Sequence, residues 1–184
     1  MNASLLLWLL LTLPVFWGVG LYNRLMRIRA RGLSALGSVE KHMRVYAELV
    51  RENLAHVAPG HARAVSAHQG APDVWAQLMT ALQAFEDALK ETGASALRDE
   101  APARLGLAFD AVQSAWQQLN EIPPDLAGPL VPTTMRTQWD AVTQRVQTAR
   151  GGFNQILAQY NEALAQFPAR LVAGAMGFKP GSKL

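Results

Sequence analysis

Four histidines are the only imidazoles in the chain and the first candidates for metal or acid–base chemistry. His56, His61 and His68 follow one another at spacings of five and seven residues, and His42 stands apart. A zinc site on a helix needs histidines three or four residues apart, or a carboxylate close by. The spacing therefore favours solvated loop histidines, with metal ligation as the alternative, and we predict no metal site.

The other ionisable residues form no recognisable catalytic arrangement. The chain has no Cys, which excludes a thiolate metal site, a Cys nucleophile and a disulfide framework. It contains no Glu-x-x-His pair of the di-iron bundle type, no Gly-rich phosphate loop and no nucleophile elbow. The carboxylates are scattered: Glu40, Glu48, Glu86, Asp87 and Asp110. We predict no catalytic residues, no cofactor and no enzymatic activity.

The apolar composition of the chain is concentrated near its start. Half of the 184 residues are hydrophobic and only 17% are charged, against about 25% in a typical soluble domain. Ser4–Tyr22 contains no charged residue, and as a helix it would be about 28 Å long, close to a hydrocarbon core of about 30 Å. Trp8, Trp17 and Tyr22 are amphipathic rings typical of membrane interfaces. We therefore predict a transmembrane helix over residues 4–22.

The charges that follow this span predict its orientation. Only residues 1–3 precede it, whereas four arginines and no acid follow it directly: Arg24, Arg27, Arg29 and Arg31. The positive-inside rule then places residues 1–3 on the non-cytoplasmic side of the membrane and the chain after Tyr22 in the cytoplasm. The lipid bilayer is thus the first predicted partner.

The basic balance of the whole chain belongs to the same stretch. Residues 22–51 carry a net charge of +5 and residues 52–184 a net charge of −2, within a total of +3. Recognition of anionic lipid headgroups by the four arginines is one interpretation, at about 1 kcal/mol per residue near the surface. A topology signal on a solvated helix face is the other. Nucleic-acid binding is not predicted, because no aromatic residues alternate with the basic ones.

Beyond the span, apolar residues recur at alternating steps of three and four, which is typical of the seam of a helical bundle. Shorter series cover residues 36–57, 75–89 and 105–119, and no stretch alternates with the period of a strand. The longest series comprises Met135, Trp139, Val142, Val146, Ala149, Phe153, Ile156, Tyr160, Ala163 and Phe167. The chain is thus predicted to be all-α, with the transmembrane helix continuing into an up-and-down antiparallel four-helix bundle over residues 23–168.

Proline, glycine and capping residues predict where these helices begin and end. A polar linker is expected over residues 56–72, with Asp73 as the N-cap of the second helix. Thr133 or Thr134 is expected to open the last helix and Pro168 to close it. The apolar and basic tail, residues 169–184, has two interpretations. It lies in the membrane interface, or it packs on the base of the bundle through Leu171, Val172 and Phe178.

Two groups of motifs resemble the LemA family. The first is Tyr22-Asn23-Arg24-Leu25 after the span, followed by Arg29 and Arg31. The second comprises Ala149-Arg150-Gly151-Gly152-Phe153-Asn154, then Tyr160-Asn161, Phe167-Pro168 and Gly177-Phe178. Gly151 and Phe153 replace the family's usual Arg and Tyr, which is typical of a divergent member.

The resemblance implies a bacterial membrane protein with a helical bundle on the cytoplasmic side and no established enzymatic activity. It also implies the inner membrane as the location and, through a magnetosome-associated relative, a membrane-organising role. The expected function is that of a membrane-anchored scaffold that binds an unknown protein partner or a second copy. The alternative is an accessory subunit or enzyme with a site in the bundle interior or in the 56–72 linker.

Overall fold

The computed structural model consists of five helices in the part of the chain that it describes. The backbone is described for residues 3–67, 71–94, 100–122 and 131–184, and side chains for 12–13, 15–52, 73–92, 100–122 and 131–184. The helices are α1 (Ala3–Ala67), α2 (Ala71–Ala94), α3 (Ala101–Glu121), α4 (Thr133–Ala165) and α5 (Ala169–Ala175). Every element in these ranges is a helix, which confirms the all-α prediction.

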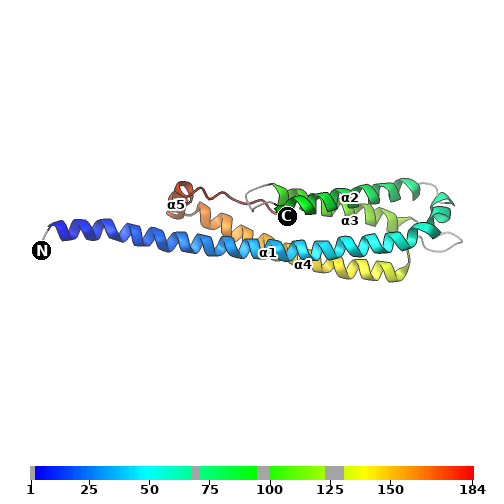
Figure 1. Ribbon diagram of the computed structural model, residues 1–184, viewed down its shortest axis with the longest axis horizontal. Helices are drawn as coiled ribbons and strands as arrows, with labels where there is room; N and C mark the ends of the chain where they lie inside the picture. The colour runs from blue at the N-terminus through cyan, green and yellow to red at the C-terminus, as the bar shows by residue number, and fades with distance from the viewer. Residues whose placement is uncertain (1–2, 68–70, 95–99, 123–130) are drawn as a thin grey trace.

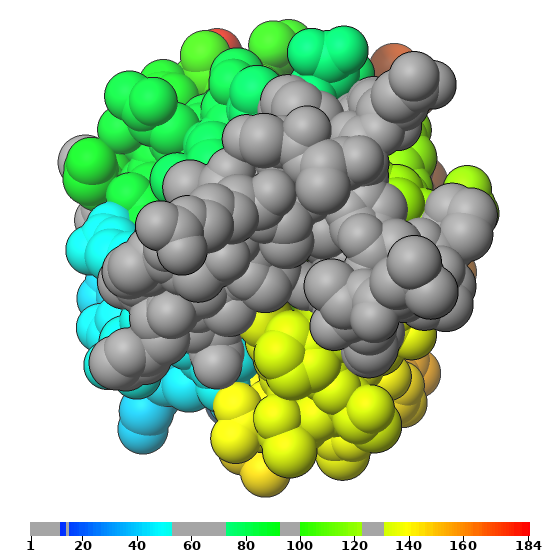
Figure 2. Space-filling view, turned by 90° about the vertical axis from the view of Figure 1, so that its right-hand side faces the viewer, coloured from blue at the N-terminus to red at the C-terminus, as the bar shows by residue number. Residues whose placement is uncertain are grey.

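The helices pack as two antiparallel pairs, α1 with α4 and α2 with α3, and α1 also contacts α2. Seen from one end of the molecule, α2 and α3 lie on one side, and α1 and α4 on the other (Figure 2). The N-terminal part of α1 projects beyond the other helices, and α5 packs against α1 and α4 near the base of this projection (Figure 1). The chain thus has one narrow, single-helix end and one broad end.

The core contains a cluster of aromatic rings from four helices. The ring of Tyr46 on α1 lies 5.9 Å from that of Phe85 on α2, 5.3 Å from Phe109 on α3 and 5.2 Å from Trp139 on α4. Trp139 also stacks on Trp116 of α3 at 3.8 Å. The Tyr46 hydroxyl accepts a hydrogen bond of 2.7 Å from the Gln113 amide, and burial raises the pKa of Tyr46. The buried phenol therefore stays protonated and joins the helices by packing.

The apolar seams are confirmed, with a drift along α4. Met135, Trp139, Val142, Val146 and Phe153 are buried as predicted. Further on, Leu157 and Leu164 are buried, whereas Ile156 is half-buried and Phe167 is 83% exposed. The prediction is wrong at these last two positions. At Ile156 the reason is that a straight helix of 3.6 residues per turn drifts by about 20° per heptad relative to a strict seven-residue repeat. Phe167 lies beyond the last residue of α4, Ala165, in the turn before α5.

The predicted linker over residues 56–72 is wrong over residues 56–67, which belong to α1, and over residues 71–72, which belong to α2. Residues 68–70 lie outside the described part of the chain. Pro59 lacks a backbone N–H and removes one helical hydrogen bond, but the helix continues through it. Asp73 is not an N-cap, because α2 begins two residues earlier, at Ala71. It lies in the first turn, where the positive end of the helix dipole stabilises a carboxylate. The predicted start of α4 at Thr133 is confirmed.

The predicted span over residues 4–22 lies partly outside the described side chains, which leave out residues 1–11 and Pro14. Within the part that the structure describes, no helix has a stretch long and apolar enough to cross a membrane. The backbone of residues 4–22 belongs to α1 throughout.

The aromatic cluster predicts how the bundle responds to truncation of its core. Phe109→Ala is expected to lower the free energy of unfolding by about 3–5 kcal/mol, because a fully buried ring is lost and a cavity remains. Leu107→Ala, on the same helix but 71% exposed, is the matched control and should change it by less than about 0.5 kcal/mol. Urea unfolding of the full chain in detergent, followed by circular dichroism, measures both. Equal losses would contradict the assignment of the core.

Candidate functional site

Large exposed apolar side chains gather at the narrow end of the molecule. The described N-terminal part of α1 contributes Leu13, Val15, Phe16, Trp17 and Val19, and the α5 region contributes Phe167, Leu171 and Met176. Between the two helices lies a groove of about 330 Å³, lined by Val15, Gly18, Val19, Tyr22, Val172, Ala175 and Met176. Exposed apolar patches of this kind mark interaction surfaces, because water solvates them poorly.

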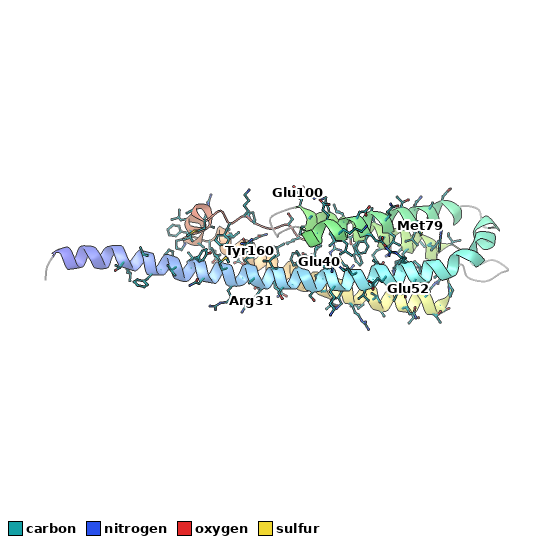
Figure 3. All side chains as sticks on the ribbon, in the orientation of Figure 1. Arg31, Glu40, Glu52, Met79, Glu100 and Tyr160 are labelled. Carbon is teal, nitrogen blue, oxygen red and sulfur yellow. The ribbon has the colours of Figure 1, made fainter. Side chains whose placement is uncertain are left out.

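The four predicted arginines follow this apolar surface along α1, but they do not all share one face. Arg24, Arg27 and Arg31 are exposed and lie three and four residues apart, so they lie on one side of the helix. Arg31 projects from α1 on the side away from α5 (Figure 3). Arg29 is half-buried and lies off that face. Arg24 also lines a hollow with Gln166, Phe167 and Pro168.

Of the four histidines, only His42 has a described side chain. Its Nδ1 lies 2.7 Å from the carbonyl oxygen of Ser38, one turn earlier on α1. His56 and His61 lie in the last part of α1, and their side chains, like all of His68, are outside the described residues. Among the described residues, no group of three His, Asp or Glu side chains could hold a metal ion.

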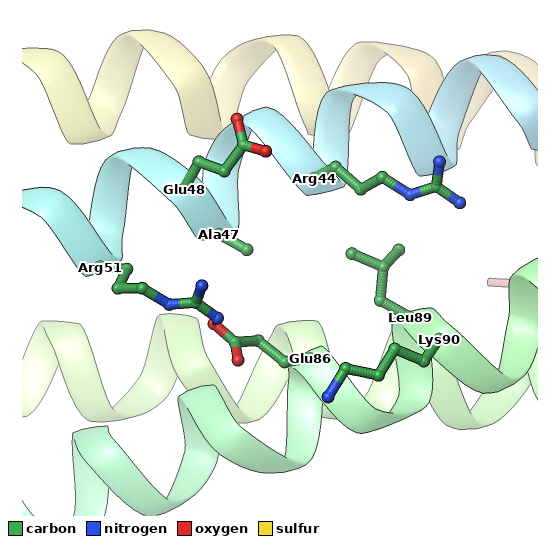
Figure 4. A pocket seen from close by; sticks show the side chains of 7 residues that line it. All are labelled: Arg44, Ala47, Glu48, Arg51, Glu86, Leu89 and Lys90. Atoms are coloured by element: carbon green, nitrogen blue, oxygen red, sulfur yellow. The ribbon is translucent and has the colours of Figure 1, made fainter.

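A second hollow, between α1 and α2, is lined by charged side chains (Figure 4). Arg51 on α1 forms an ion pair with Glu86 on α2. Arg44 pairs with Glu40 at 3.4 Å, and Lys90 with Asp87 at 3.1 Å. The basic members of these pairs are well exposed, so each pair contributes little to stability. Since the cations already have carboxylate partners, the hollow offers no concentrated charge to a ligand.

The chain after α5 turns back and lies extended along α4, an arrangement that the sequence did not predict. The amide of Asn161 donates to the carbonyl of Gly181 at 3.0 Å and accepts from its N–H at 2.9 Å. Asn154 makes the same two bonds with Leu184, both 3.0 Å. The Tyr160 hydroxyl adds a bond of 3.2 Å to the carbonyl of Lys179. We call residues 179–184 the strap.

The strap ends against α3 at Gly106. A Cβ at Gly106 would lie 2.5 Å from the carbonyl carbon of Leu184, so only glycine leaves room for the strap there. Leu184 itself is only 6% exposed. Beside it, Arg150 of α4 forms two hydrogen bonds with Asp110 of α3, at 2.5 and 2.9 Å, and so joins the two helices next to the strap.

For the tail, residues 169–184, the predicted packing on the bundle holds for some residues and not for others. Phe178 packs on the core, with its ring 5.9 Å from that of Tyr22, and Val172 is half-buried, as expected for packing on the bundle. Leu171, in contrast, is 66% exposed, so the prediction that it packs on the base is wrong. α5 thus has one face on the bundle and one apolar face in the open.

These features define a class of helical proteins: a long N-terminal helix continuous with an antiparallel bundle, and a C-terminal segment fastened across that bundle. The chain belongs to the LemA family, whose profile matches residues 88–184, more than half of the chain. The match includes α3, α4, α5 and the strap, whereas the Tyr22-Asn23-Arg24-Leu25 motif lies outside it. No curated protein and no solved structure matches the chain.

The hydrogen bonds of the strap predict its exchange behaviour. Replacing Asn154 and Asn161 together by Ala removes four bonds worth roughly 0.5–1.5 kcal/mol each. Hydrogen exchange of the strap amides should then be faster by about tenfold or more, while the core amides of α3 keep their protection. Asn120→Ala, which removes a bond within α3, is the control. Unchanged exchange at Gly181 and Leu184 would contradict the fastening.

Proposed function

We propose that this protein is a single-pass, membrane-anchored helical scaffold of the LemA type, without catalytic activity. The observation that carries the proposal is the succession along α1 of an uncharged apolar segment, whose large described side chains between 13 and 19 are exposed, and then the arginines. A membrane presents the same succession, from hydrocarbon to anionic headgroups. The N-terminal segment would cross the bilayer, and the bundle would stand on its surface.

α5 has the properties of a helix that lies at the membrane surface. It packs at the base of the narrow end, and Leu171 and Met176 are exposed there next to Arg170. Burying such side chains in the interface releases water from apolar surface, at about 25 cal/mol per Å². The groove between α1 and α5 would then face acyl chains, and Arg24, Arg27 and Arg31 would meet the headgroups.

The proposed location is the inner membrane of a bacterium, with residues 1–3 outside and the bundle in the cytoplasm. The arginines that follow the apolar segment support this orientation through the positive-inside rule. The bundle surface would then be available to a protein partner or a second copy, in keeping with a membrane-organising role.

The alternative is an accessory subunit or enzyme with its site in the bundle interior or in residues 56–72. The composition of the described core favours the scaffold. Among the described buried residues, Thr92 is the one with a polar side chain apart from the tyrosines and tryptophans, and its hydroxyl donates to the carbonyl of Ala88 at 2.8 Å. A catalytic site would need several convergent polar groups. Residues 56–67 continue α1.

Binding of anionic lipid tests the headgroup contact. The four-fold variant with Arg24, Arg27, Arg29 and Arg31 replaced by Gln should retain phosphatidylglycerol at least about tenfold less well than wild type, because each arginine contributes up to roughly 1 kcal/mol and about 1.4 kcal/mol in total corresponds to tenfold. Native mass spectrometry of the full chain in detergent, with phosphatidylglycerol or phosphatidylcholine added, measures this. The matched control, with the same change in charge, replaces Lys41, Arg44, Lys90 and Arg145 by Gln. Equal retention by both variants would rule out the contact.

The orientation has its own test, made simple by the absence of native Cys. A Cys in place of the exposed Leu107 should react with a membrane-impermeant maleimide in lysed spheroplasts but not in intact ones. The full-length band on a gel reports the labelling. Reaction in intact spheroplasts would place the bundle outside and overturn the proposed topology.

A further inference from the structure

The strap lies beside the contact between α3 and α4. These two helices pack through their side chains: Trp116 of α3 stacks on Trp139 of α4 at 3.8 Å, and Arg150 of α4 pairs with Asp110 of α3. Gly106 of α3 lies against Leu184 of the strap, and Asn154 and Asn161 of α4 bond along its length. We call the surface of α3 and α4 that the strap covers the α3/α4 groove.

The α3/α4 groove binds the backbone of the strap rather than its side chains. Each asparagine pairs with both the N–H and the C=O of one residue, as a neighbouring residue in an antiparallel sheet does. Asn154 and Asn161 are seven residues apart, about 10.5 Å along a helix. Gly181 and Leu184 are three residues apart, about 10 Å along an extended chain. The two spacings match, so one face of α4 binds an extended peptide in a fixed register.

Only one side chain of the strap is selected strongly by the groove. Leu184 is buried, whereas Lys179, Pro180 and Lys183 are exposed. Backbone pairing together with one apolar anchor is the usual way in which a protein binds an extended peptide. The glycine at 106 is part of this recognition, because any side chain there would collide with the backbone of Leu184.

The strap is fastened in a way that permits release. Leu184 is buried, but Asn154, Asn161 and Gly181 are half-buried and Lys179 is exposed, unlike the fully buried aromatic cluster. Segments held partly by such exposed groups open before the core does. Gly177, in the left-handed region at φ +67°, lies between α5 and the strap. Since glycine adopts many backbone conformations, it is a natural pivot.

We infer that the α3/α4 groove is a peptide-binding groove, filled in cis by residues 179–184 and, once that strap is released, by the same segment of a second copy. The second copy is the occupant because the structure shows that its segment fits the groove. Exchange between copies keeps every hydrogen bond and the buried Leu184, so it costs no contact energy and depends on concentration. The inference does not rest on membrane binding.

Two complementary full-length variants test the exchange. Leu184→Asp places a charge in the apolar site and releases the strap, which leaves an open groove. Gly106→Ala closes the groove and leaves an intact strap free. Each variant alone should sediment as a monomer in detergent, and an equimolar mixture should form a 1:1 complex at concentrations at which wild type stays monomeric.

The asparagines provide the specificity control. Adding Asn154→Ala and Asn161→Ala to the Leu184→Asp chain should abolish its complex with Gly106→Ala. In a second mixture, the Asn154→Ala, Asn161→Ala double variant takes the place of Gly106→Ala, and its released strap should still bind the Leu184→Asp chain. Circular dichroism checks that all variants keep wild-type helicity. A mixture of folded partners that stays monomeric overturns the inference, and so does a complex that survives loss of both asparagines.

Discussion

The fold depends on the packing of one ring, that of Tyr46, against rings from the three other long helices. Phe85, Phe109 and Trp139 each bring one helix to Tyr46, and burying these rings removes much apolar surface from water. Because Tyr46 belongs to α1, the cluster anchors this long helix in the bundle at a point well behind its N-terminal end. The part of α1 before the bundle is then held out as a projection, and its apolar side chains and arginines occupy the narrow end of the molecule.

That constraint explains why the two ends of the molecule differ. At the narrow end, α5 and the start of α1 leave large apolar side chains exposed, with basic side chains beside them. Along the bundle, charged pairs such as Arg51 with Glu86 and Arg104 with Glu91 are distributed with both signs. In the proposed function, the apolar end would meet lipid, and the charged sides of the bundle would stay in water.

The sequence predicted the helices and most of the core, because a bundle seam is a local pattern of period 3.5 to 3.6 that requires no knowledge of tertiary contacts. It failed where the outcome depended on distant parts of the chain. The drift that buries Leu157 in place of Ile156 depends on where a straight helix meets its neighbours. The strap was missed for the same reason, although two aromatic-Asn pairs, Phe153-Asn154 and Tyr160-Asn161, repeat at seven residues and were visible. In each pair the ring is buried, and the asparagine beside it reaches the strap.

The central claim is that the narrow end of the molecule lies at a lipid surface. The most direct test is the depth of a nitroxide on a single Cys at Leu171, compared with one at Met79 on α2, in proteoliposomes of the full chain. Both side chains are exposed, so both sites accept the label without disturbing the core. Power saturation with oxygen and with a polar nickel complex should place the label at 171 at the edge of the hydrocarbon and the label at 79 in water. Equal accessibility of both labels to the nickel complex would contradict the claim.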